Sequence, residues 1–395
     1  MLALRLARGS DPAALGRRLL LAGAAAGVSF LLLAALCHAL DHPGSGGESG
    51  LRLAACALPL AATVQLAVAV ARADPTVRAR SGLAAAGLGP ARVPVLAAVS
   101  TAVAALLGSV LALTVFLHLR GDIHGSPFDG AGTGWLAPGR QVPMGAALTL
   151  LAIVPVTAAA ASALALRPRP EPRPAAVAPP RGVLAAPGPP VPAPAGLPWG
   201  TALATAGVAV SAYDGSDDPA TTLPLPGALD YLTPAVAGGW LLIAAGMVLA
   251  APGLAHLGGR LLAAGRPGAL RLLAGRGLQQ EAVRLGRPLG ALCAASAALC
   301  AGLRLDGPRL FGPLVVLGAG IVLASVLGTI AAASAEAREA RAETTAALLR
   351  LGTPRSLLRG AAAMRLTLLL AIFGAVTWLA TELILLPTPG WAQGG

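Results

Sequence analysis

Hydrophobic and polar positions alternate along this chain in long blocks. Apolar stretches of about 20 residues are separated by segments rich in Arg, Gly and Pro. A helix of about 20 apolar residues is long enough to cross the hydrocarbon core of a bilayer. The pattern therefore predicts an all-α, polytopic integral membrane protein with about nine transmembrane helices. The predicted spans are about 17–40, 51–71, 94–118, 143–166, 195–213, 235–257, 286–303, 309–333 and 361–386.

The span at 195–213 is short and contains Pro198, and charge placement is the reason to include it. Without this crossing, the loop that holds Asp214 and Asp230 would be inside. The segment 260–287, which carries six arginines, would then be outside. That arrangement would reverse the usual excess of positive charge in cytoplasmic loops.

Composition supports a membrane protein and fixes its orientation. The mean hydropathy is +0.74, and only 12% of residues are charged, against about 25% in soluble proteins. The net charge of +12 could suggest nucleic-acid binding, but the arginines gather in the segments that this topology places inside. We therefore expect no nucleic-acid partner and a multi-pass protein of the cell membrane. Its first span is expected to be a retained signal-anchor, with the N-terminus cytoplasmic and the C-terminus extracytoplasmic.

The segment 167–198 differs from its surroundings because it holds twelve prolines in 32 positions. Such a composition excludes a helix and favours an extended polyproline spacer. Its four arginines predict that it is cytoplasmic. We interpret it as a linker between two halves of the chain.

Two segments 263 residues apart share one pattern. Arg78–Arg92 and Arg341–Arg355 each lie between two predicted spans, and each ends in Leu-Gly-x-x-Arg. Ala35-Leu-Cys37 matches Ala298-Leu-Cys300 at the same offset. An even number of spans separates the copies, so the repeats are parallel, unlike the inverted repeats of many carriers. The predicted units are a first module at 1–166, the linker 167–198, a helix pair at 199–257, an amphipathic inner-surface segment at 258–285, and a second module of three spans at 286–395.

The segments that carry this repeat resemble the FtsX-like permease family of the MacB type. The resemblance lies in the segment Arg341–Arg355, where basic residues and a Glu are followed by Arg and Gly. It is looser in the segment Arg78–Arg92, which has no Glu. It implies the permease subunit of an ABC transporter, whose two cytoplasmic helices dock on a separate ATPase, one helix for each of two copies. The docking residues it implies are Arg80, Leu88, Gly89, Arg92, Glu343, Arg350, Leu351, Gly352 and Arg355.

The family also implies an amphiphilic substrate such as a lipid, lipoprotein or peptide, and contact with membrane lipids. Two features depart from the family pattern. The second module lacks a fourth span, and the outer loops are short. We therefore keep open a degenerate, non-transporting scaffold or regulatory partner, and a secondary carrier with parallel repeats. The scarcity of ionisable groups within the spans disfavours the carrier.

The sequence contains no catalytic motif. It has no Lys and so cannot form a Walker A loop, and it has neither Gly-x-Ser-x-Gly nor His-Glu-x-x-His. We expect no enzyme activity in this chain and no cofactor. One cluster of metal-ligand residue types occurs at the outer ends of two spans, where polar interface residues are the favoured interpretation over a metal site. These residues are His38, Asp41, His42, His118, Asp122 and His124.

Overall fold

The structure is a computed structural model that describes residues 12–44, 46–74, 92–122, 142–167, 193–213, 233–264, 268–306 and 312–385. Nearly all of these residues lie in helices. The helices are α2 (Pro12–Asp41), α3 (Gly46–Ala55), α4 (Ala57–Arg72), α7 (Arg92–Arg120), α8 (Met144–Leu166), α9 (Gly196–Tyr213), α10 (Pro234–Ala263), α11 (Ala269–Asp306), α12 (Pro313–Ala340), α13 (Ala342–Arg350) and α14 (Arg355–Leu385). The all-α fold class is confirmed.

Eight helical segments within the described residues are long and apolar enough to cross a membrane. One of them, Gly46–Arg72, joins α3 and α4 across a single interrupting residue, Cys56. The predicted fifth span forms a helix, α9, but it is not one of the eight. Glycine, threonine and serine dilute its apolar content over only 18 residues. The described part of the chain thus has eight candidate spans where the sequence pattern predicts nine.

Large apolar side chains cover the outside of the helices. On α7 they form a continuous stripe in which every member is more than half exposed: Val95, Leu96, Val99, Val103, Leu106, Leu107, Val110 and Leu111. A water-soluble protein rarely exposes so large an apolar patch, whereas lipid tails solvate it at no cost. The chain is therefore a multi-pass membrane protein.

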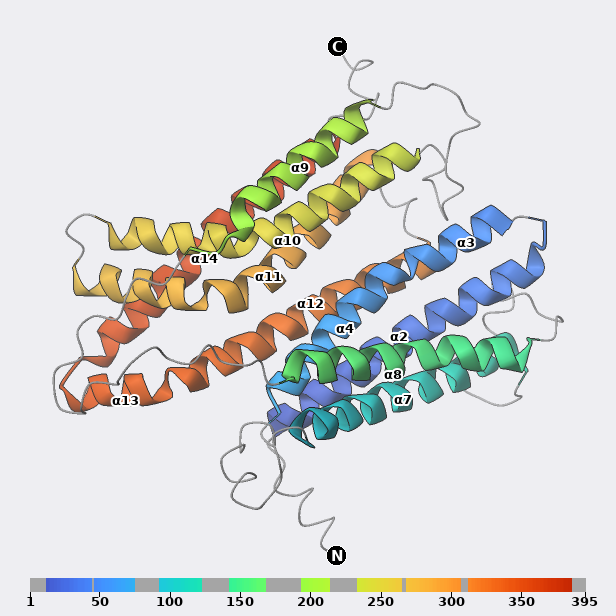
Figure 1. Cartoon of the computed structure of the whole chain (residues 1–395), viewed down its shortest axis with the longest axis horizontal. Coiled ribbons are helices and arrows are strands. Elements are labelled where there is room, and N and C mark those ends of the chain that lie inside the picture. The colour runs from blue at the N-terminus through green and yellow to red at the C-terminus, as the bar shows by residue number, and fades with distance from the viewer. Residues whose placement is uncertain are drawn as a thin grey trace, which may run out of the picture.

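The helices form two groups, which Figure 1 shows side by side. In the first, α2, α4, α7 and α8 share a core that includes Leu21, Leu66, Ala105 and Val154. The hydroxyl oxygens of Ser29 and Ser109 lie 2.9 Å apart inside this group and link α2 to α7. In the second group, α10, α11 and α14 share another core, and α9 packs along α10.

Helix α12 contacts both groups. Its Ile321 belongs to the core of the first group and fits against Gly27 of α2. Near its other end, the Glu336 carboxylate lies 3.7 Å from the Arg284 guanidinium of α11. Gly318 of α12 faces Leu31, and Gly328 faces Leu20, so α12 runs antiparallel to α2.

Glycines bring α9, α10 and α11 into backbone contact. A Cβ atom at Gly239 of α10 would lie 2.6 Å from the carbonyl oxygen of Gly207 in α9. One at Gly246 would lie 2.5 Å from the carbonyl oxygen of Gly200. In lipid, helices associate through such close packing, because burying apolar side chains away from equally apolar lipid tails gives no hydrophobic driving force. The helix pair expected at 199–257 is thus a tight antiparallel pair formed by α9 and α10.

Helices α10 and α11 bend together (Figure 1). Pro252 lies inside α10 and Pro288 inside α11, and a Cβ at Gly286 would lie 2.5 Å from the Cα of Pro252. Interior prolines remove a helical hydrogen bond and bend the helix. The described part of 258–285, expected as one surface segment, is therefore divided between two helices that continue through this bend.

Both helices extend well past the bend. At about 1.5 Å per residue, the 38 residues of α11 span about 57 Å, longer than the ~30 Å hydrocarbon core. We call the end of the molecule where α10 ends and α11 begins the arginine end. It also holds the start of α2 and the end of α4, where Arg18 and Asp74 form an ion pair of 2.8 Å. Of the described arginines, only Arg52, Arg120 and Arg304 lie toward the other end of their helices.

Candidate functional site

The corner formed by α12, α13 and α14 at the arginine end is the candidate functional site. Helix α13 has nine residues and none of them is buried. Leu351, which follows it, is 82% exposed, and Arg350 and Arg355 are exposed as well. A short helix that exposes both leucine and arginine has an amphipathic surface, of the kind that helices use in recognition.

A glycine turn ends α13. Gly352 has φ +86°, in the left-handed region. Its amide donates to the Leu349 carbonyl at 3.1 Å, and the Thr353 amide donates to the Leu348 carbonyl at 3.1 Å. These two bonds form a Schellman motif, in which glycine takes the position after the helix cap. Pro354 then prevents the helix from continuing, and α14 begins at Arg355.

Arg341 forms the joint between α12 and α13. It is the C-cap of one helix and the N-cap of the other. Its Nε donates to the Ala337 carbonyl at 3.1 Å, and its Nη1 lies 2.5 Å from Oε1 of Glu281 in α11. The joint is therefore attached to α11 by an ion pair.

The same carboxylate oxygen also reaches α14. Nη1 of Arg365 lies 3.6 Å from Oε1 of Glu281, and Nε of Arg365 donates to the Ala361 carbonyl at 3.3 Å. Gly277, one turn before Glu281, makes room for this side chain, since a Cβ there would lie 2.7 Å from Arg365 Nη1. The Glu281 side chain is only 11% exposed. We call Glu281, Arg341 and Arg365 the ion cluster.

Of the docking residues implied by the family resemblance, the structure brings five together at this corner: Glu343, Arg350, Leu351, Gly352 and Arg355. Arg80, Leu88 and Gly89 lie outside the described residues. Arg92 is the first residue of α7. The predicted cytoplasmic helix of the first module stays a prediction.

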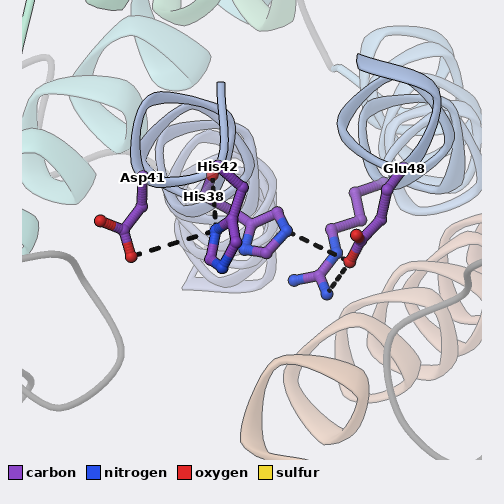
Figure 2. A network of polar contacts seen from close by, with 5 residues as sticks. His38, Asp41, His42 and Glu48 are labelled. Atoms are coloured by element: carbon purple, nitrogen blue, oxygen red, sulfur yellow. Dashed lines mark hydrogen bonds and ion pairs between the residues drawn. The ribbon is translucent and has the colours of Figure 1, made fainter. Parts of the chain in front are cut away.

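The outer histidines form a separate polar network (Figure 2). Nε2 of His38 lies 3.3 Å from Oε1 of Glu48, which also pairs with Arg52 at 2.7 Å. The rings of His38 and His42 stack with centroids 4.3 Å apart. The network joins the end of α2 to α3. His124 lies outside the described residues, and no described group of three or more His, Cys, Asp or Glu residues is placed to hold a metal ion.

Sequence reasoning did not find Glu281. One signal was available, because Glu281 is the only acidic residue between positions 258 and 287, among six arginines. A single acidic residue among several arginines, however, can form an ion pair with any of them, so the sequence does not identify its partner. Its pairing with Arg341 and Arg365 rather than with a neighbour on its own helix depends on how α11, α12 and α14 pack.

Comparison with protein families, with curated proteins and with solved structures finds no match for this chain. The membrane fold and the geometry of this corner are therefore the features from which we infer a function.

Proposed function

We propose that this protein is the permease subunit of an ABC transporter of the FtsX-like, MacB type, and that a separate ATPase docks on α13. The observation that carries the proposal is the exposed α13, which lies between two candidate membrane helices and ends in a glycine turn closed by two hydrogen bonds. Its leucines can enter an apolar groove of a partner while its arginines meet acidic groups at the rim.

The surroundings of α13 support a role in transmitting motion. Helix α12 packs on the first helix group, while α14 belongs to the second. A force applied to α13 therefore acts where the two groups are joined. ATP-driven closure of two ATPase copies would then shift the groups as rigid bodies.

In this proposal the arginine end is cytoplasmic, because arginines are retained on the inner face of the cell membrane. The chain itself carries no ATPase activity, and its substrate is an amphiphile such as a lipid, lipoprotein or peptide. The ion cluster lies at the arginine end rather than halfway along the spans, and a permease driven by a separate ATPase needs no ionisable groups at the midplane of the membrane.

The test is co-purification with a co-expressed ABC-type ATPase, with ATP hydrolysis measured on the complex. Charge reversal of Arg350 and Arg355 to Glu is expected to abolish both co-purification and stimulation of hydrolysis. The matched control reverses Arg271 and Arg276, which are exposed on α11 at the same end and change the net charge equally. Loss of binding in the control alone, or in neither variant, would reject α13 as the docking helix.

A further inference from the structure

The ion cluster joins three helices through one carboxylate. Arg341 lies at the start of α13, and Arg365 lies in the third turn of α14. Glu281 of α11 pairs with both, at 2.5 Å and 3.6 Å. The segments on either side of α13 are therefore both attached to α11.

We propose that Glu281 is a positioning residue that fixes the α13 corner to α11 and α14, so that α13 moves with the second helix group. Without this attachment, α13 would be held only by α12, most of which packs on the first group, and by the glycine turn that leads into α14. The ion cluster therefore couples a movement of α13 to the second helix group. This inference rests on the proposed function for its consequence in transport, but the attachment itself can be tested without any ATPase.

Burial gives the cluster its strength. A buried charge whose partner is removed is strongly unfavourable, because water cannot replace the lost pairing. Replacing Glu281 by the isosteric Gln would leave two guanidinium groups facing each other across a neutral amide. The corner is then expected to separate from α11, because the released Arg341 can reach water.

A second ion pair, which joins α11 to α12 close to the same joint, provides a matched control. Arg284 of α11 and Glu336 of α12 lie 3.7 Å apart, but the Arg284 side chain is 52% exposed. Exposed ion pairs are screened by water and salt and contribute little to stability. Glu336→Gln therefore makes the same chemical change, Glu to Gln, at an ion pair of α11 and leaves Glu281, Arg341 and Arg365 in place.

The experiment measures the distance between spin labels at Arg271→Cys in α11 and Ala346→Cys in α13, both exposed positions. The full chain is used in lipid nanodiscs with the exposed Cys300 replaced by Ser. We expect one narrow distance distribution in this background and in Glu336→Gln. Glu281→Gln and Arg341→Gln are both expected to broaden the distribution and shift its mean.

If Glu281→Gln fails to fold, Arg341→Gln decides the question, because its side chain is one-third exposed and its loss leaves Arg365 paired with Glu281. An unchanged distribution in the variants that fold would overturn the proposal, as would an equal change in Glu336→Gln.

In the complex with the ATPase, Glu281→Gln is expected to keep co-purification and to lose most of the stimulation of hydrolysis. The double variant Arg350→Glu plus Arg355→Glu tests the docking of the ATPase separately. Docking on α13 and attachment by Glu281 can therefore be disproved independently.

Discussion

At the scale of single residues, Gly352 controls how α13 ends. Alanine at this position meets no atom within 4 Å, so its penalty comes only from the left-handed backbone, about 1–2 kcal/mol. Gly352→Ala is therefore expected to open the two closing hydrogen bonds of α13 more often. The hydrogen-exchange rates of the backbone amides of residues 352 and 353 should rise by roughly 5–30-fold.

Gly374→Ala in α14 is the control for this substitution. Gly374 also has open space around it but lies inside a helix, where alanine is favoured over glycine by about 1 kcal/mol. Exchange in α13 should stay at its original rate in this variant. Equal exchange rates in Gly352→Ala and the unmodified protein would show that the turn does not hold the end of α13.

Gly352 and Glu281 differ in how far the sequence could predict them. Gly352 lies in the repeated Leu-Gly-x-x-Arg pattern, and its positive φ fits a local signal, because helix termination depends on neighbours in sequence. Glu281 pairs with arginines 60 and 84 positions later in the chain. No local pattern encodes such partners.

At the scale of helices, the contact between α9 and α10 depends on glycine at defined positions. Gly238 and Gly239 are adjacent in α10, yet a Cβ at Gly238 meets no atom within 4 Å, whereas one at Gly239 would lie 2.8 Å from the Cβ of Ser211. Gly239→Ala is therefore expected to force the two helices apart, at a cost of about 1–3 kcal/mol. Thermal unfolding of the purified protein in detergent should occur several degrees lower.

Gly238→Ala provides the control one residue away. It faces open space, and alanine is the better helix former by about 1 kcal/mol. Its melting temperature is expected to equal or exceed that of the unmodified protein. Similar melting temperatures for the two variants would argue that the backbones of α9 and α10 are not in contact at this level.

The boundaries of the spans were predictable because the blocks of apolar residues end in charged or proline-rich segments. The predicted spans at 94–118 and 143–166 agree closely with α7 and α8. The continuation of α10 and α11 past Pro252 and Pro288 was not predictable in the same way. An arginine-rich amphipathic segment can lie on a membrane surface or extend a spanning helix, and contacts with other helices decide between them.

At the scale of the whole molecule, α12 makes the two helix groups one structure. Its glycines face leucines of α2 and α4, while its last turns reach α11. Its sequence could not predict these contacts, since α12 is apolar on nearly all sides and favours no particular neighbour. The parallel repeat predicts only that α4 and α12 run in the same direction. The contacts of Gly318 with Leu31 and of Gly328 with Leu20 show that α12 runs antiparallel to α2.

The orientation of the molecule provides the last prediction. Arg18 pairs with Asp74 at the arginine end, so the chain enters the segment 75–91 from the same end that carries α13. Because arginine-rich segments are retained in the cytoplasm, Ser81→Cys and Ala346→Cys should both react with a membrane-impermeant maleimide only when the inner face is accessible. Gly47→Cys, an exposed position at the opposite end, should react from outside intact cells. Each introduced cysteine is compared in the Cys300→Ser background, in which the remaining cysteines, Cys37, Cys56 and Cys293, are buried. Labelling of positions 81 and 346 from opposite faces would eliminate the parallel repeat, and with it the idea that one ATPase assembly grips both halves of this chain.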